Sequence, residues 1–310
     1  MAEPHGSGER SSSVLSMTLS IIILSYNTKD LTIRCINSII DQYKLELDKD
    51  QFEIILVDNA STDDSVDVIS NFQFPISNKN SIKLIKSKEN LGFSKGCNLG
   101  AEKASGEYLL FLNSDTEVKD QGFVKMVDYL KKNEQIGILG GALRNEDGTA
   151  QASAGKFYNL FNLFLAMIGL ERAGFLRESP KEIQKVDWVS GASLMISKKV
   201  FEKIGGFAKE LFMYAEDMEL CYRANEKNFP TYFYPEVTLF HKERGSSNRT
   251  FAILNIYKGI LFFYKKDKSF PEYKVASAIL FLKAFALSKI GKLTGNKYLQ
   301  ETYGQALGLF

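Results

Sequence analysis

The sequence is poor in several residue types that mark particular classes of protein. Its 310 residues include only three cysteines, two histidines and one tryptophan. Cys35, Cys97 and Cys221 are far apart and odd in number, so they match no zinc-binding spacing and indicate a reducing compartment. The two histidines, His5 and His241, exclude a metal site built from several imidazoles. No apolar run reaches the ~18 to 20 residues that a membrane-spanning helix needs.

Charge is also balanced rather than one-sided. The net charge is +2 at pH 7, so no overall basic field attracts nucleic acid, and we expect no nucleic-acid partner. Residues 1–16 lack an apolar core of signal-peptide length, and we expect a flexible leader or tag there, with Met17 as the candidate natural start. Together with the cysteine usage, this predicts a cytoplasmic protein. We leave open a peripheral position at the inner face of the cell membrane.

What the sequence does contain is an alternation of strand-like and helix-like segments. Short apolar runs that read as buried strands occupy residues 18–25, 52–57, 82–86 and 108–112. Between them, apolar residues recur at helical spacing over 28–40, 66–72 and 95–104. This order over the first ~115 residues predicts an α/β fold with a parallel, doubly wound sheet.

Two of these strands end in an acid. Asp58 and Asp115 each follow a buried run, and the carboxyl ends of parallel strands share one edge of the sheet, where open α/β sheets bind ligands. A divalent metal under a nucleotide diphosphate would suit Asp115, because such a metal prefers hard oxygen ligands. Asp58 could accept a hydrogen bond from a base N–H or a ribose hydroxyl. The alternative is that both acids only stabilise turns.

Three further features lie in the second half. The adjacent acids Glu216 and Asp217 open a predicted helix, where one could act as a general base, or both could simply complement the helix dipole. His241 is either a structural residue or a second metal ligand. Trp188 is either a core residue or, beside the small-residue bend at 190–192, part of a sugar pocket.

The C-terminal segment has a different character. Residues 256–297 hold nine lysines against two acids, Asp267 and Glu272, and the lysines alternate with aromatic residues. We interpret this segment as one or two basic amphipathic helices. Their polar face could be merely solvated, could lie on an anionic membrane surface, or could drive homo-oligomerisation.

Taken in order, the motifs resemble those of family 2 glycosyltransferases. The first half carries IILSYN, VDNASTD, NLGFSKGCNLG and GEYLLFLNSDT, and the second carries WVSGA, GGF, YAEDMELCYR and the isolated His241. The similarity runs from about residue 19 to residue 247 and is greatest to the rhamnosyltransferase-like branch that builds bacterial surface glycans. Asn113 departs from the pattern, since it replaces the first acid of the family's D-x-D motif.

The resemblance implies a GT-A fold, which is a mostly parallel, Rossmann-like central sheet with flanking helices, here over 17–250 with a helical extension at 251–310. It also implies inverting transfer of a sugar from a UDP- or dTDP-linked donor to a glycan, lipid-linked or protein-linked acceptor, with Mn²⁺ or Mg²⁺. The implied metal ligands are Asp115 and His241, and the implied catalytic base is Asp217. The implied nucleotide-binding residues are Ser25, Tyr26, Asn27, Asp58, Lys95, Asn113 and Ser114. The implied sugar- and acceptor-binding residues are Trp188, Gly191, Ala192 and Glu216.

Two other functions remain open from the sequence. A nucleotidyltransferase also combines an α/β sheet with a metal, but it usually carries a glycine-rich phosphate loop after the first strand, and the residues at 25–28 are not one. A catalytically silent glycan-binding or scaffold module would not need the acids at 115, 216 and 217. We therefore expect an enzyme whose residues 58, 115, 217 and 241 converge on one metal–nucleotide pocket.

Overall fold

The computed structural model describes residues 17–170, 176–242 and 248–310. The expectations for residues 1–16 lie outside this part of the chain. Four parallel strands form the first half of the main sheet, in the spatial order β3-β2-β1-β4. Their bounds are β1 (Leu19–Ser25), β2 (Phe52–Asp58), β3 (Ile82–Lys86) and β4 (Tyr108–Asn113). The predicted parallel arrangement of these strands is therefore confirmed, and the order reverses beside β1, as in doubly wound folds.

Helices cover both faces of these strands. They are α1 (Lys29–Asp48), α2 (Ser65–Asn71) and α3 (Gly92–Glu102). Alternate side chains of β1 point to opposite faces, so Ile21 and Ile23 share a core cluster with Cys35 of α1. Ile22 belongs to a second cluster, with Cys97 of α3. Burial on both faces explains why this strand reads as an unbroken apolar run.

The second half of the sheet is mixed rather than parallel. β12 (Ser193–Ser197) lies antiparallel between β4 and β6 (Ile138–Arg144), and β13 (Thr231–His241) continues parallel to β6. The sheet is completed by β10 (Gln184–Val186), β5 (Thr116–Val118) and β7 (Ala150–Gln151). The strand-like runs at 231–234 and 237–241 belong to this one strand β13, whose register with β6 is irregular after Tyr234. The antiparallel pairs therefore lie in this half of the sheet, whereas the strands of the first half are parallel as expected.

Smaller elements surround the second half. β8 (Ala154–Gly155), β9 (Arg177–Glu178) and β11 (Trp188–Val189) make a separate three-stranded sheet. The helices are α4 (Gly122–Lys132), α5 (Leu160–Met167), α6 (Lys198–Ile204) and α7 (Glu216–Glu226), and a short 3₁₀ turn, η1 (Lys79–Ser81), precedes β3. Helix α5 is shorter than the helix predicted over 157–170.

Three helices end the chain, and the segment at 256–297, where one or two were expected, contains most of the first and all of the second. They are α8 (Arg249–Asp267), α9 (Phe270–Thr294) and α10 (Lys297–Leu307). Phe263 and Tyr264 of α8 are fully buried in the cluster that covers one face of the sheet, so α8 shares the core of the preceding residues. The expected division after residue 250 falls in its first turn. Within the described residues, no helix combines the length and the apolar character needed to cross a membrane.

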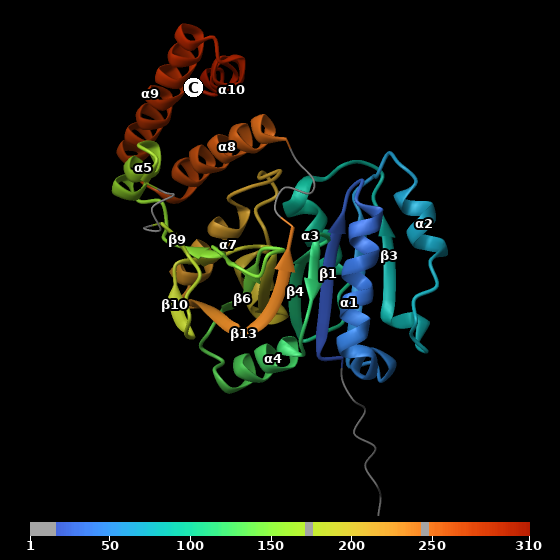
Figure 1. Ribbon diagram of the computed structural model, residues 1–310. Helices are drawn as coiled ribbons and strands as arrows, with labels where there is room; N and C mark the ends of the chain where they lie inside the picture. Colours follow the sequence, from blue (N-terminus) through green and yellow to red (C-terminus); the bar gives the residue numbers. More distant parts are fainter. Residues whose placement is uncertain (1–16, 171–175, 243–247) are drawn as a thin grey trace, which may run out of the picture.

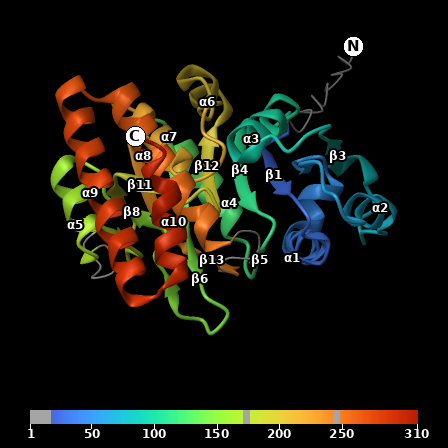
Figure 2. The ribbon, with the colours of Figure 1, turned by 90° about the horizontal axis from the view of Figure 1, so that it is seen from above.

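The C-terminal helices form a layer above the sheet (Figure 1). Viewed from above, α8, α9 and α10 lie over the half of the sheet that contains β6 and β12 (Figure 2). They leave the half with β1, β2 and β3 uncovered. The layer lies at the end of the sheet where β1 and β4 terminate, and this is the end that carries the predicted site residues.

Candidate functional site

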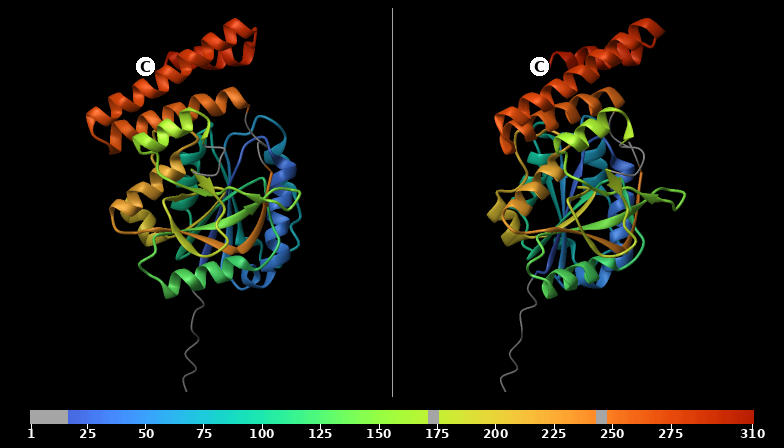
Figure 3. Two further views of the ribbon diagram at one scale, coloured as in Figure 1. Left: turned by 60° about the vertical axis from the view of Figure 1, so that its left-hand side comes forward. Right: turned by 90° about the vertical axis from the view of Figure 1, so that its left-hand side faces the viewer.

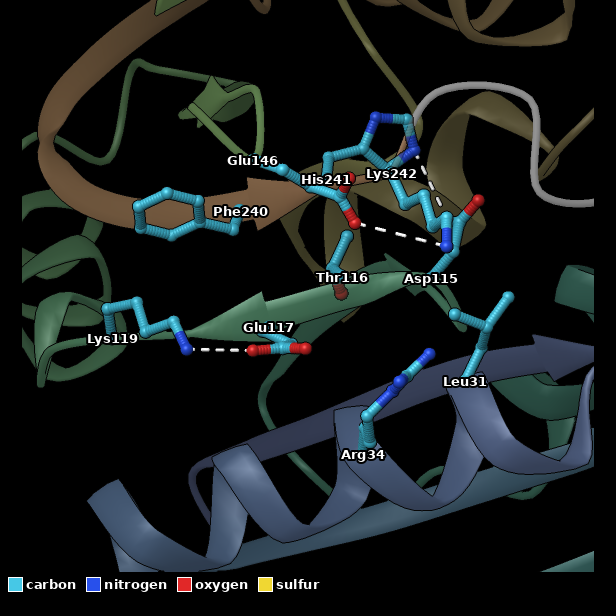
Figure 4. A pocket seen from close by; sticks show the side chains of 10 residues that line it. All are labelled: Leu31, Arg34, Asp115, Thr116, Glu117, Lys119, Glu146, Phe240, His241 and Lys242. Atoms are coloured by element: carbon cyan, nitrogen blue, oxygen red, sulfur yellow. Dashed lines mark hydrogen bonds and ion pairs between the residues drawn. The ribbon is translucent and has the colours of Figure 1, made fainter. Parts of the chain in front are cut away.

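The structure brings Asp115 and His241 together at the end of β4. The short strand β5 follows the Asn113–Asp115 loop and pairs with β13, which places Thr116 opposite His241. The Nε2 atom of His241 then lies 3.3 Å from Oδ1 of Asp115 and 3.2 Å from Nδ2 of Asn113 (Figure 4). Two residues that are far apart in the sequence thus face each other because two strands pair.

A hydrogen-bond chain fixes the tautomer of His241. Its Nδ1 atom lies 2.7 Å from Oε1 of Gln151, and the amide nitrogen of Gln151 donates to Oδ1 of Asn145 over 3.2 Å. The Gln151 oxygen therefore accepts from Nδ1–H, and in the neutral ring the lone pair of Nε2 faces Asp115 and the amide nitrogen of Asn113. A lone pair and a carboxylate oxygen that face each other form a site for a cation.

The donor set fits the metal that the resemblance implies. One carboxylate and one imidazole suit Mn²⁺, and the carboxylate suits Mg²⁺ as well. Over the described ranges, no group of three or more His, Cys, Asp or Glu side chains could hold a metal ion. A metal held by Asp115 and His241 would therefore keep several coordination positions open for other ligands.

The acid pair opens α7 on a strained backbone. Tyr214 and Ala215, which precede it, have φ values of 69° and 68°, a region that non-glycine residues rarely adopt and that is common at functional sites. Helix α8 supports this turn closely, because a Cβ atom on Gly259 would lie only 2.7 Å from the Cβ of Ala215. The turn is thus held by the layer above it.

Burial changes the protonation of the acid pair. Burial, together with the neighbouring charge of Asp217, raises the pKa of Glu216 to about 8. Burial also raises the pKa of Asp217, while the N–H groups of Gly191 and Met218 oppose the shift. The Oε2 atom of Glu216 is buried and has no hydrogen-bond partner among the described residues. A protonated Glu216 beside an ionised Asp217 is an arrangement suited to proton transfer.

The bend at 190–192 connects Glu216 and Asp217 to the end of β4, where Asp115 and His241 lie. The N–H of Gly191 donates to Oδ2 of Asp217 over 3.1 Å. The carbonyl oxygen of Ala192 accepts from the N–H of Asn113 over 3.3 Å. Asp217, the bend and the end of β4 are therefore consecutive neighbours in space.

Hydroxyl groups join the strand ends that carry the residues predicted to bind the nucleotide. Ser25 bonds to Thr28 and Thr32, and Thr28 bonds in turn to Ser114 of the β4 loop. Thr28 occupies the N-cap position of α1, but its side chain makes no cap bond to the helix. Its hydroxyl instead ties the first strand end to the β4 loop.

Asp58 makes the turn bond that was one of the two roles considered for it. It lies opposite Ser25 in the register of β1 and β2. Its Oδ2 atom accepts from the N–H of Ser61 over 3.2 Å, which is a turn bond. Its Oδ1 atom is buried, and within the described residues it has no partner. One oxygen therefore remains for a donor group of a ligand.

The remaining nucleotide-side residues differ in exposure. Asn27 has a φ of 54° and bonds to Ser61 and Thr62, so it joins the loops after β1 and β2. Tyr26 is half-buried, and Lys95 is exposed in the first turn of α3. Helix α2 begins at Ser65, whose N–H donates to Asp63, so neither Ser61 nor Thr62 caps it.

Trp188 is covered rather than open. It is 4% exposed, its indole N–H donates to the carbonyl oxygen of Lys156, and Arg177 lies over its ring. The sequence analysis placed this ring in the sugar pocket. The buried ring instead anchors β11, and β11 leads directly into the bend at 190–192.

A cavity of about 390 Å³ adjoins the metal pair (Figure 4). Asp115 and His241 line it together with Arg34 and Leu31 of α1 and with Lys242. Asp58 and Asp217 are not among its lining residues. The four residues expected in one pocket are therefore at one end of the sheet, but this cavity holds only the metal pair.

Sequence reasoning missed Gln151, which orients His241. The turn at 145–149 was recognised, and a hairpin there would have placed Gln151 on a strand. Its partner, however, is set by the pairing of β7 with β6 and of β6 with β13. No local pattern carries that information.

Comparisons with known proteins agree with this geometry. The family model described as "Glycosyl transferase family 2" matches residues 20–205. The chain is 27% identical over 218 residues to the low-salt glycan biosynthesis hexosyltransferase Agl10 of Haloferax volcanii, covering 68% of this chain and 62% of that protein. It is 24% identical over 216 residues to the N-acetylglucosaminyl-diphospho-decaprenol L-rhamnosyltransferase of Mycobacterium tuberculosis, covering 63% of this chain and 68% of that protein.

Two solved structures share the fold. One is GalNAc-T7 crystallised with UDP, GalNAc and Mn²⁺, with a TM-score of 0.58 and 17% identity over 93% of this chain and 55% of that chain. The other is S. aureus TarS 1-349, with a TM-score of 0.52 and 15% identity over 94% of this chain and 89% of that chain. The GT-A type of fold expected from the motifs is therefore confirmed.

Proposed function

Because the chain belongs to glycosyl transferase family 2, we propose that it transfers a sugar, with inversion, from a nucleotide-diphosphate sugar to a glycan, lipid-linked or protein-linked acceptor. A UDP- or dTDP-linked sugar is the donor. Synthesis of a bacterial surface polysaccharide or glycoconjugate is the setting, at the cytoplasmic face of the cell membrane. The rhamnosyltransferase and hexosyltransferase relatives support this class of reaction.

The observation that carries the proposal is the cation site between Asp115 and His241. The lone pair on Nε2 of His241 faces a carboxylate oxygen at 3.3 Å, and Gln151 holds the ring in that orientation. Either Mn²⁺ or Mg²⁺ fits these donors, and when bound it would offset the negative charge that develops on the leaving diphosphate.

The residues around the first strand end bind the nucleotide. Asp58 accepts from the base or the ribose with its free Oδ1 atom, and the hydroxyl groups of Ser25 and Ser114 line the same strand ends. Tyr26, Asn27, Lys95 and Asn113 complete this set. Asn113 carries no charge, so it adds a hydrogen-bond donor where the family's motif has an acid.

Asp217 removes the proton from the acceptor hydroxyl. The hydroxyl oxygen attacks the anomeric carbon of the donor while the bond to the diphosphate breaks on the opposite face, so one displacement inverts the configuration. Glu216 is neutral at pH 7, because its pKa is about 8. It can therefore donate a hydrogen bond to the sugar, and Gly191 and Ala192 of the adjoining bend complete this side of the site. No carboxylate nucleophile is required, unlike in a retaining glycosidase.

A donor screen tests the proposal. The protein is incubated with a panel of nucleotide sugars and either Mn²⁺ or Mg²⁺, and the nucleotide products are separated. We expect free nucleoside diphosphate from one donor class, in a metal-dependent reaction. Pyrophosphate would instead identify a nucleotidyltransferase, and no turnover with any donor and a broad set of acceptors would identify a silent binding module.

A further inference from the structure

Helix α9 carries large apolar side chains that remain exposed after it packs on α5, α8 and α10. Only four of its residues are buried, whereas large apolar side chains along it are 41 to 85% exposed. They are Val275, Phe281, Leu282, Phe285, Ile290 and Leu293. Exposed apolar side chains that recur along one helix in this way mark an interaction site rather than scattered surface residues.

Helix α5 extends this face. The Nζ atom of Lys283 on α9 donates to the carbonyl oxygen of Ala166 over 3.2 Å, so the two helices lie side by side. Phe161, Phe164 and Ile168, in and next to α5, are also exposed. Figure 3 shows α9 and α10 standing clear of the sheet, with α5 beside them. The face therefore combines two segments that are separate in the sequence.

The charge on this face has one sign. Between Glu272 and Glu301 the chain has no acid, but it has five lysines. Lys274 and Lys289 lie over the rings of Phe270 and Phe285, at 5.3 and 5.4 Å from the ring centres. Lysines that rest their stems on apolar rings and extend their ammonium groups are typical of helices at a membrane interface.

A small cavity lies between α9 and α10 on this layer. Its volume is about 220 Å³, and its lining combines Lys289, Lys292, Ser288 and Gln300 with the apolar Phe285 and Leu307. Two ammonium groups and two neutral polar side chains at the rim of an apolar surface suit a phosphate-bearing headgroup. This feature is independent of the apolar face.

We propose that α9, with α5 and the α9–α10 cavity, docks on an anionic lipid bilayer. A second copy of the chain is a less suitable occupant, because it would bring two lysine-rich faces together without acids to pair them. A bilayer surface instead supplies both an apolar interior and negative headgroups.

The position of the face adds a functional consequence, which rests on the proposed function. Helix α8 begins the same layer and packs through Gly259 on the turn before Glu216 and Asp217. Docking through this layer therefore holds the acid pair close to the bilayer. We infer that the acceptor is lipid-linked.

Vesicle co-sedimentation tests the docking. The full chain is mixed with phosphatidylcholine vesicles, either pure or containing phosphatidylglycerol, and the bound fraction is measured at low and high salt. We expect binding only to the anionic vesicles, weakened by salt. The double variant K289E/K292E should lower the binding constant roughly thirtyfold or more. The control K131E/K132E makes the same change of charge on exposed residues of α4 and should bind like the wild type.

Apolar variants test the second component. Leu282 and Leu293 are 57% and 85% exposed, so L282S/L293S should fold normally and still lose most of its vesicle binding. L45S on α1, where Leu45 is 59% exposed, is the matched control. If K289E/K292E and L282S/L293S bind vesicles as well as the wild type does, the proposal is overturned. It is also overturned if the protein forms a concentration-dependent dimer that these two variants abolish. Metal-dependent donor hydrolysis in detergent-free solution should be unchanged in all of them, so a failure of docking is distinguishable from a failure of the proposed function.

Discussion

The strand ends on the two sides of β4 treat their polar groups differently. On the β1 side, the hydroxyl groups of Ser25, Thr28, Thr32 and Ser114 bond to one another. The exception on this side is the Oδ1 atom of Asp58, which has no partner within the described residues. On the side of α7, a buried carboxylate oxygen of Glu216 has no partner within the described residues, and two consecutive residues before it have positive φ. We propose that the first side binds the nucleotide and that the second, with its buried acid pair, carries the proton transfer.

The largest effect should come from removing the base on the strained side. Asp217→Asn keeps the shape of the side chain and its bond to Gly191 but cannot accept a proton, so we expect transfer to fall by about 10² to 10⁴. Nucleotide binding, which belongs to the other side, should persist. Initial rates and calorimetry with the donor nucleotide check both. Glu226→Gln, at the exposed end of the same helix, is the control. Near-normal transfer by Asp217→Asn would remove the base assignment.

A smaller effect should follow from changing Gln151, which links His241 to the sheet. Gln151→Leu removes the acceptor for Nδ1 of His241, so the ring loses its orientation and we expect Mn²⁺ affinity to fall about 10- to 100-fold. Gln151→Glu keeps an acceptor there and should retain most of the affinity. Electron paramagnetic resonance of free Mn²⁺ measures both. If the two variants bind Mn²⁺ equally, Gln151 has only a structural role.

The raised pKa of Glu216 predicts a pH dependence of stability. In the folded protein this group keeps its proton up to about pH 8, whereas an ordinary glutamate loses it near 4.5. The folded state therefore binds more protons over that range, and its stability falls as the pH rises through it. The total is on the order of 2 to 4 kcal/mol. Urea unfolding of the wild type should show this slope, and Glu216→Gln should flatten it. Parallel curves would show that Glu216 ionises normally.

The smallest effect concerns how α8 is joined to the body. Tyr264→Phe loses one hydrogen bond, from its hydroxyl to the carbonyl oxygen of Tyr158, and should cost about 1 kcal/mol. Tyr298→Phe is the matched control, because its buried hydroxyl has no partner in the described part of the chain and its removal should be neutral or stabilising. Urea midpoints compare the two, and the reverse order would contradict the assignment.

The same two sides differ in how far the sequence predicted them. On the β1 side, unbroken apolar runs and the acids behind them located strands and strand ends to within a residue or two, because each signal is local. An apolar run at 193–196 also indicated the strand β12, but its antiparallel pairing with β4 and β6 is non-local and had no such signal, and neither had the short strands β5 and β7. Asp115 and His241 were therefore predicted together as metal ligands from their motifs, whereas Gln151, whose contact depends on the pairing of β7 with β6 and of β6 with β13, was not found at all.

The C-terminal helices teach a related lesson. Their lysines and aromatic residues correctly indicated helices, but not that Phe263 and Tyr264 complete the core of the sheet. Periodicity alone does not distinguish a helix face that packs on the body from one that remains open. The contacts of α8 and the exposure of α9 separate the two only in the structure.

The most direct test of the central claim is calorimetry of UDP and dTDP binding with and without Mn²⁺, in the wild type and in Asp115→Ala. The account predicts that Mn²⁺ strengthens binding of one nucleotide in the wild type and that Asp115→Ala loses this gain, while Asp41→Ala on α1 retains it. Unchanged Mn²⁺-dependent affinity in Asp115→Ala would contradict the assignment of Asp115 and His241 as the metal site.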